Sequence, residues 1–382
     1  MRRARGSFST MFGLVLLAAC SSKPQTPTAT TTGAASGSFY SAGAGPNPVG
    51  VIPRAILHDP QRNKDLEMSI EYPTRNGPYP IIIFSHGFGG SNLGYVALTE
   101  YWTSHGYVCI KPKHADAGAL ADPKNALAEW RKQNENNWRD RARDVTLILD
   151  SLATLEQQYP ELRDRMDHAK IGVGGHSYGA FTTMQLGGMK VFQNGSALTL
   201  SDPRIKAAIA MSPQGVGDAN GLTPESWRDV RLPILYMTGT LDKLADGEAV
   251  ERRHDAFQYS PAGDKYFVSI EGARHLSFVG RFDITDDDLR RPNTNTPPIY
   301  DPRDPRDPNN PNNPNYYPPQ QNQLGRGSGP AYGRERQIFN TIKASSRAFW
   351  DAYLKENKDG RDFLKSASLR SDVGTSGAVE MK

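Results

Sequence analysis

Cysteine is scarce in this chain: only Cys20 and Cys109 occur among 382 residues. Two cysteines cannot build a disulfide framework, and no Cys/His cluster has the spacing of a zinc site. The formal net charge of +4 is small for this length, and no basic patch with interleaved aromatic residues stands out. The composition therefore argues against nucleic-acid binding and gives no reason to expect a metal or another cofactor.

The N-terminus has the composition of an export signal. Met1–Arg5 is basic, and the apolar run from Met11 to Ala19 is too short to span a membrane as a mature helix. The end of this run, Leu17-Ala18-Ala19-Cys20, resembles the lipobox of bacterial lipoproteins, in which the cysteine is lipidated and becomes the first mature residue. An ordinary signal peptide that is cleaved nearby is the alternative.

We therefore expect residues 1–19 to be a lipoprotein signal peptide and Cys20 to carry a lipid anchor in the membrane. The protein would then be exported to the bacterial cell envelope. The serines that follow Cys20, in place of an acidic residue, resemble sorting to the outer rather than the inner membrane.

The rest of the chain divides into one domain and three segments of biased composition. Residues 20–47 consist mainly of Ser, Thr, Gly, Ala and Pro without periodicity, which predicts a flexible tether. A single domain is expected over residues 48–370. Within it, residues 291–330 are dominated by Pro, Asn and Asp and favour a solvated loop, with a lid as the alternative. Residues 371–382 are predicted to be a disordered tail.

Strand and helix patterns alternate through the domain, which predicts a mostly parallel central sheet with helices on both faces, an α/β fold. Leu66–Tyr72 suits an early antiparallel strand, and Cys109 is expected to be a core residue of a short apolar strand. Helices are predicted over Asn137–Gln158 and over about residues 335–355. The charged residues near the start of the first of these helices are interpreted as a solvated, salt-bridged face; they are Arg139, Asp140, Arg141, Arg143 and Asp144.

The most informative motif is Gly175-His176-Ser177-Tyr178-Gly179, a G-x-S-x-G sequence between an apolar run and a helical segment. A strand-to-helix turn of this kind lifts the serine oxygen above the sheet and holds the serine in a strained backbone conformation. Side chains two positions to either side would collide, so Gly175 and Gly179 leave room. The motif predicts that Ser177 is a catalytic nucleophile.

Two further residues follow Ser177 in the chain order Ser, Asp, His that this motif predicts. Asp242 comes directly after a buried-looking strand and a short turn, and His275 follows the end of the next strand. Catalytic groups gather at the carboxyl edge of such sheets. His275 would accept the proton of Ser177, and Asp242 would orient the imidazole. The competing side chains are Asp218, Asp246 and His254.

An oxyanion hole is predicted in the loop after another buried strand, Pro80–Phe84. The loop Ser85-His86-Gly87-Phe88-Gly89-Gly90 lacks the glycine spacing of nucleotide-binding loops. A backbone N–H from such a loop can point at a developing oxyanion, and the residue after the nucleophile supplies a second one. We expect the N–H groups of Phe88 and Tyr178 to be these donors.

Several stretches resemble the α/β-hydrolase group of dienelactone hydrolase-like, bacterial platelet-activating-factor acetylhydrolase-like and chlorophyllase-like proteins. The stretches are Ile83–Gly90, Ser104–Val108, Arg143–Val145 with Leu149–Asp150, Gly175–Gly179 and Gly239–Asp242. The resemblance covers roughly residues 50 to 280 and implies a serine carboxylic-ester hydrolase of the α/β-hydrolase fold. Dienelactone hydrolases carry a Cys nucleophile, so Ser177 argues against dienelactone as the substrate.

The segments that could cover the active site favour small ester molecules as substrates. Ala115–Asn136 is rich in charged residues and Pro213–Asp229 in Gly, Asp and Asn, and neither offers a sustained apolar helical face. We therefore expect short-acyl esters to be preferred. A polyester (cutinase-like) hydrolase, a phospholipid (acetylhydrolase-like) hydrolase and a non-catalytic surface binding protein are the alternatives.

Overall fold

The computed structural model describes residues 40–119, 136–217, 221–243, 249–280 and 330–382, the first three of the last range by their backbone alone. The expected signal peptide at 1–19, Cys20, most of the tether at 20–47 and the insertion at 291–330, except Pro330, lie outside these ranges. Asp218 and Asp246 lie outside them as well.

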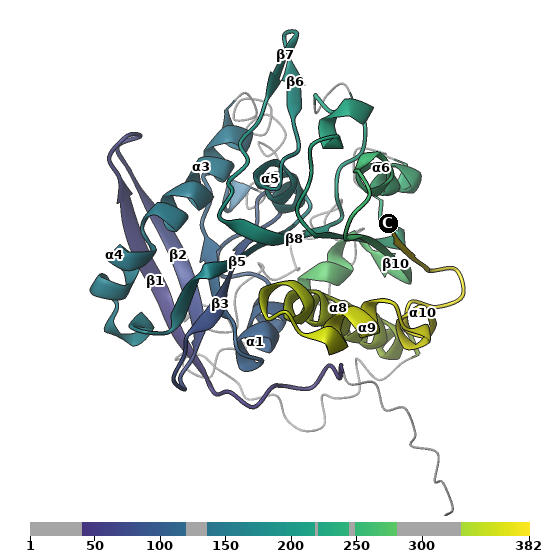
Figure 1. Ribbon diagram of the computed structural model, residues 1–382, viewed down its shortest axis with the longest axis horizontal. Coiled ribbons are helices and arrows are strands. Elements are labelled where there is room, and N and C mark those ends of the chain that lie inside the picture. Colours follow the sequence, from purple (N-terminus) through teal and green to yellow (C-terminus); the bar gives the residue numbers. More distant parts are fainter. Residues whose placement is uncertain (1–39, 120–135, 218–220, 244–248, 281–329) are drawn as a thin grey trace, which may run out of the picture. The chain divides into compact units, whose positions relative to one another are not determined.

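The described residues form a nine-stranded sheet in the order β1-β2-β4-β3-β5-β8-β9-β10-β11 (Figure 1). The strands from β4 to β10 pair in parallel, whereas the β1–β2 hairpin and β11 join through antiparallel pairings. The strands are β1 Val49–Asp59, β2 Lys64–Pro73, β3 Tyr79–Ser85, β4 Val108–Pro112, β5 Met166–His176, β8 Ile205–Met211, β9 Ile234–Leu241, β10 Lys265–Arg274 and β11 Ala378–Met381.

Helices cover both faces of this sheet (Figure 1). On one face lie α3 Asn137–Asp150, α4 Leu152–Gln158, α5 Tyr178–Leu186 and α6 Asp255–Tyr259, and on the other lie α1 Val96–Ser104, α8 Pro330–Leu354, α9 Lys358–Leu364 and α10 Ala367–Asp372. Short elements complete the fold: the 3-10 turns η2 Pro160–Leu162, η4 Pro224–Trp227, η5 Val250–His254 and η6 His275–Val279, and the hairpin β6 Val191–Gln193 with β7 Ser196–Leu198. The predicted α/β-hydrolase fold is therefore confirmed.

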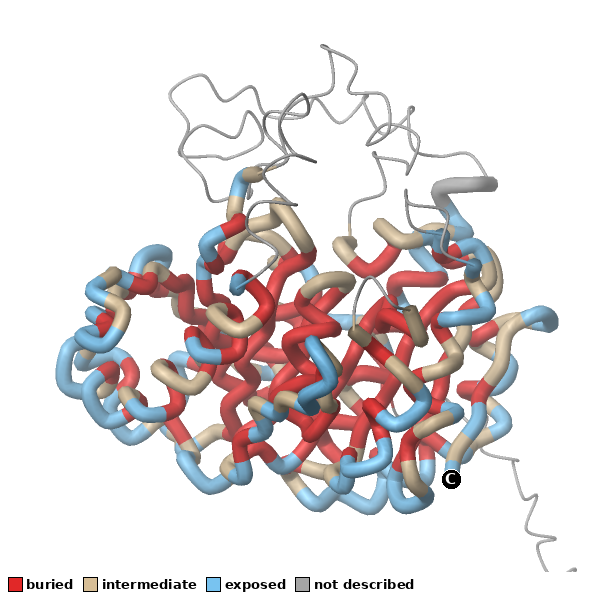
Figure 2. Tube along the Cα trace, turned by 90° about the horizontal axis from the view of Figure 1, so that it is seen from above, coloured by how far each residue is buried: buried red, intermediate tan, exposed pale blue. Residues whose placement is uncertain are grey.

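Two apolar cores lie on the two sides of the sheet. Alternation along β3 divides its residues between them: Ile81 and Ile83 belong to the core under α3 and α5, and Ile82 and Phe84 to the core under α1 and α8. Because both faces are covered, the central strands are continuous apolar runs. Their residues are mostly buried, and the centre of the molecule is correspondingly red in Figure 2. Cys109 is buried in the second core, as expected.

The sequence predictions were wrong at both ends of the domain. Residues 378–381 of the expected disordered tail form β11, which pairs with the edge strand β10 and satisfies its backbone groups. The end of the expected tether is likewise attached to the domain. Tyr40 is buried with its ring 5.0 Å from that of Phe363, and Tyr101 Oη donates a hydrogen bond to the carbonyl of Ser41 at 2.7 Å.

Candidate active site

Ser177 occupies the turn between β5 and α5, at φ 56° and ψ −118°. This backbone conformation costs a non-glycine residue about 1–3 kcal/mol and is kept only where the surroundings impose it. A Cβ on Gly175 would lie 2.3 Å from the carbonyl oxygen of Gly179, and a Cβ on Gly179 would lie 2.0 Å from that of Ser85. Both positions therefore require glycine, and the second lets α5 approach the end of β3.

The two predicted partners of Ser177 meet at the carboxyl edge of the sheet. Asp242 follows β9, His275 follows β10, and His275 Nδ1 lies 2.8 Å from Asp242 Oδ1. Thr238 Oγ1 donates a second hydrogen bond to Asp242 Oδ2 at 2.9 Å. Burial alone would raise the pKa of Asp242, but the hydrogen bond and charge of His275 and the Arg253 guanidinium hold this pKa below its usual range. Asp242 is thus a buried, ionised carboxylate bound to an imidazole.

His176, the residue before Ser177, connects this pair to the turn. Its ring centroid lies 4.6 Å from that of His275, and its Nδ1 lies 2.9 Å from Tyr95 Oη. Burial, and then the charge of His275, lower the pKa of His176 well below the usual value, so His176 is neutral. The competing His254 instead lies 3.1 Å from Glu380 Oε1.

The predicted oxyanion loop lies directly beside the turn. The N–H of Gly87 donates to Tyr95 Oη at 3.2 Å, and the N–H of Gly89 donates to Asp116 Oδ2 at 3.1 Å. Within the part of the chain that the structure describes, the N–H of Phe88 between them has no acceptor. The rings of Phe88 and Tyr178 meet edge to face with 6.3 Å between their centroids, which brings the two expected donor residues together.

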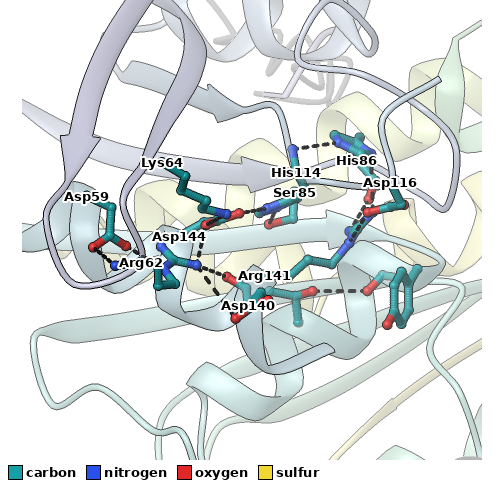
Figure 3. Close-up of polar contacts among 12 residues, drawn as sticks. Asp59, Arg62, Lys64, Ser85, His86, His114, Asp116, Asp140, Arg141 and Asp144 are labelled. Atoms are coloured by element: carbon teal, nitrogen blue, oxygen red, sulfur yellow. Dashed lines mark hydrogen bonds and ion pairs between the residues drawn. The ribbon is translucent and has the colours of Figure 1, made fainter. Parts of the chain in front are cut away.

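A buried ion pair lies against this loop, and the sequence analysis missed it. Arg141 of α3 binds Asp116 with both Nε and Nη2, at 2.9 and 2.6 Å, and both side chains are buried (Figure 3). Arg141 Nη1 also donates to the carbonyl of His86 at 2.7 Å. The prediction that the charges of this helix form a solvated face is therefore wrong for Arg141 and Asp144.

Asp144 belongs to a second buried polar cluster, which adjoins the first (Figure 3). His114 Nδ1 lies 2.9 Å from Asp144 Oδ2, and His114 Nε2 lies 3.0 Å from Ser85 Oγ. Asp144 Oδ1 also contacts Arg62 Nη1 and Lys64 Nζ, each at 2.8 Å. These bonds tie the end of β3 to α3 and to the β1–β2 turn.

The helical period was the signal that could have found these buried charges. Arg141, Val145 and Ile148 lie at spacings i, i+4 and i+7, and Asp144 lies at i+3, so all four share one face of α3. That face is the one that packs on the sheet. The single helix predicted over Asn137–Gln158 is in fact two helices. The first, α3, ends at Asp150 and the second, α4, begins at Leu152, with Ser151 between them.

The described residues hold no group of three or more His, Cys, Asp or Glu side chains arranged to bind a metal. In the same residues, no helix has both the length and the apolar character needed to cross a membrane.

The sequence of this chain is similar to a chlorophyllase family model over residues 55–225. That stretch contains the oxyanion loop, the buried clusters and Ser177, and it ends before Asp242 and His275. The family match therefore covers the candidate nucleophile and the oxyanion loop but not Asp242 and His275.

Individual relatives are similar to this chain over longer stretches than the family model. Cutinase est1 of Thermobifida alba is 26% identical over 211 residues, which cover 55% of this chain and 57% of the cutinase. The platelet-activating factor acetylhydrolase of Cavia porcellus is 24% identical over 242 residues, which cover 54% and 50% of the two chains. The corresponding protein of Bos taurus is 26% identical over 237 residues, covering 53% and 48%. The chain therefore spans about half the length of the relatives it matches. The fold is that of an α/β-hydrolase, and the sequence is similar to chlorophyllase, cutinase and platelet-activating-factor acetylhydrolase sequences.

Proposed function

We propose that this protein is a serine carboxylic-ester hydrolase that acts through Ser177, His275 and Asp242. The observation that carries the proposal is the 2.8 Å contact between Asp242 and His275, whose ring packs against the residue that precedes the strained Ser177. Relatives named cutinase and acetylhydrolase support ester hydrolysis as the reaction class.

The proposed mechanism gives one task to each group. His275 Nε2 accepts the proton of Ser177 Oγ as that oxygen attacks the ester carbonyl, and the protonated imidazole then donates its proton to the leaving alcohol. Asp242 receives the Nδ1–H of His275, which fixes the tautomer and stabilises the imidazolium. The N–H groups of Phe88 and Tyr178 bind the oxyanion. Water then hydrolyses the acyl-enzyme by the same steps.

Short-acyl esters are the proposed substrates, and a p-nitrophenyl ester series from acetyl to decanoyl tests this. We expect kcat/KM to be highest from acetyl to butyryl and to fall for longer chains. The Ser177→Ala variant, with an unchanged circular dichroism spectrum, should lose at least about 10³-fold of the activity.

Other outcomes separate the alternatives. An optimum at decanoyl, or a rate jump above the solubility limit of the substrate, would favour a lipid or polyester hydrolase. Activity of Ser177→Ala close to that of the wild-type protein would remove Ser177 from the mechanism. A folded wild-type protein without turnover would indicate a binding protein.

We also propose that the mature protein is held in the cell envelope by a lipid on Cys20. The support is the sequence Leu17-Ala18-Ala19-Cys20 after a basic and apolar leader. Mass spectrometry of the N-terminal peptide from the native source should find Cys20 as the first residue with acyl and diacylglyceryl additions. An unmodified N-terminus at another residue would contradict the proposal.

A further inference from the structure

We propose that Arg141, together with Asp116, is a positioning residue of the oxyanion loop. The guanidinium would set the direction of the Phe88 N–H and hold the Tyr178 ring at the same time, and so align both donors. This inference rests on the function proposed above, because it concerns the same oxyanion.

The first argument comes from the hydrogen bonds of the two peptide groups before Phe88. The carbonyl of His86 accepts from Arg141 Nη1 at 2.7 Å, while the N–H on the other side of that peptide, from Gly87, donates to Tyr95 Oη. The next carbonyl, that of Gly87, lies 3.4 Å from Arg141 Nη2 and also accepts from the N–H of Gly90 at 3.1 Å.

The imidazole of His86 adds a further bond to the same carbonyl. Its Nε2 accepts from the N–H of His114 at 3.2 Å, so its Nδ1 carries the proton and donates to the Gly87 carbonyl at 2.7 Å. Burial and the charge of Arg141 lower the pKa of His86 well below its usual value, which keeps this ring neutral.

These bonds determine where the Phe88 N–H points. Gly77–Pro78 is the one cis peptide bond of the described chain, so the peptide between Gly87 and Phe88 is trans. In a planar trans peptide the carbonyl and the N–H point in opposite directions. Three donors that hold the Gly87 carbonyl towards Arg141 therefore turn the Phe88 N–H away from Arg141.

Asp116 completes the arrangement from the other side of Phe88. Its Oδ2 accepts from the N–H of Gly89 at 3.1 Å and from Arg141 Nη2 at 2.6 Å. The Arg141 guanidinium holds the pKa of Asp116 below its usual range against the opposing effect of burial, so the carboxylate stays ionised. The residues before and after Phe88 are thus fixed by one ion pair.

The same guanidinium reaches the second expected donor residue. Its carbon lies 4.4 Å from the centroid of the Tyr178 ring, within the range of a cation–π contact. Arg141 is fully buried, and a buried ion pair is by itself weak support for stability, because apolar residues of similar volume often serve as well. Its contacts with the residues around Phe88 and with Tyr178 favour a role in aligning the donors.

The test replaces Arg141 with lysine, which keeps the charge but lacks the planar fork that reaches two carbonyls and a carboxylate together. We expect kcat of Arg141→Lys to fall about 10- to 100-fold while KM stays within about threefold, because a displaced donor affects the transition state more than the bound ester. The Ki of a trifluoromethyl ketone, whose adduct on the nucleophile is an oxyanion, should rise by the same factor as kcat falls. All rates are divided by the concentration of active sites, titrated with an organophosphonate.

Lys111→Gln is the matched control. Lys111 is also buried in an ion pair, with its Nζ 2.8 Å from Glu71 Oε1, but among the described residues it makes no hydrogen bond to the loop at 86–89. This variant should lose thermal stability and keep kcat per active site and Ki within about threefold of wild type. A merely structural role for Arg141 would give Arg141→Lys the same pattern, which would overturn the proposal.

Asp116→Asn carries the test if Arg141→Lys does not fold. An asparagine keeps one oxygen for the Gly89 N–H but loses the charge that holds Arg141, and kcat should fall about tenfold with a parallel rise in Ki. Unchanged kcat and Ki would overturn the proposal. A wild-type protein that hydrolyses no ester would remove both the proposed function and this inference, whereas active variants beside an active wild type would remove the inference alone.

Discussion

Two Ser, His and Asp sets in the described part of this protein differ in what surrounds them. The first comprises Ser177, His275 and Asp242, and the second comprises Ser85, His114 and Asp144. The His–Asp contacts are alike, at 2.8 Å between His275 and Asp242 and 2.9 Å between His114 and Asp144. In the second set the serine contacts the imidazole, with Ser85 Oγ 3.0 Å from His114 Nε2. The His–Asp contact alone therefore does not distinguish the proposed active site from a buried structural cluster.

Access to solvent does distinguish the two sets. The side chain of His275 is 13% exposed, whereas that of His114 is 0% exposed. Ser177 stands on a strand-to-helix turn in a strained conformation, whereas Ser85 ends β3 and lies in register with Gly175 of β5. No substrate carbonyl can approach a serine within the sheet, so the second set serves to connect elements.

The charged groups around His114 and Asp144 are a further difference between the two sets. Burial and the charge of Arg141 lower the pKa of His114, which opposes the protonation that a general base must undergo. Asp144 is already neutralised by Arg62 and Lys64, and its bonds to His114 and Lys64 lower its pKa to about 2 despite burial. An imidazolium at His114 would therefore gain little from this carboxylate.

The largest expected contrast is between the two aspartates. Asp242→Asn should lower kcat about 10⁴-fold, because the amide cannot hold the correct tautomer of the base. Asp144→Asn should destabilise the protein by about 3 kcal/mol, since it leaves a buried network without its anion, and should change kcat per active site less than about tenfold. Steady-state kinetics and urea unfolding of both variants measure the two effects. Similar losses of kcat in both would mean that the clusters act as one unit.

A smaller effect is expected in the pH dependence of stability. His86, His114 and His176 have lowered pKa values in the folded protein, so below pH 6.5 the unfolded chain binds protons that the folded protein does not. The free energy of unfolding should therefore fall with decreasing pH from about 6.5, by up to about 1.4 kcal/mol per pH unit for each such histidine.

Urea unfolding at pH 7, 6 and 5 measures this slope, and His114→Asn tests one contribution to it. The slope of this variant should be smaller than that of wild type by about one proton. Equal slopes would show that His114 is protonated in the folded protein. A further decrease in the free energy of unfolding is expected as the pH falls from 3.8 towards 2. The lowered pKa of Asp144 contributes stability only above that window.

The mostly parallel sheet and the alternation of strands and helices were predictable because buried central strands are continuous apolar runs and the G-x-S-x-G turn has a strict local form. The positions of Asp242 and His275 followed from the chain order that the motif predicts and from strand ends, since parallel strands bring their carboxyl ends to one edge. Such predictions use short-range patterns, and both residues come directly after the strands that position them.

The buried clusters could not be predicted in the same way. Arg141 and Asp116 are 25 residues apart, and nothing in either local sequence states that they pair. Charged residues usually lie at the surface, so a run of alternating charges in a helix is first interpreted as solvated. The β11 strand was missed for a similar reason: four residues near the end of the chain carry little periodicity, and their partner lies more than 100 residues earlier.

Covalent labelling tests the difference between the two serines most directly. The wild-type protein is treated with an organophosphonate ester probe, digested and mapped by mass spectrometry, with Ser177→Ala and Ser85→Ala treated in parallel. We expect one adduct, on the peptide that contains Ser177, present in Ser85→Ala and absent from Ser177→Ala. An adduct on Ser85, or labelling that persists in Ser177→Ala, would contradict the assignment of Ser177 as the nucleophile.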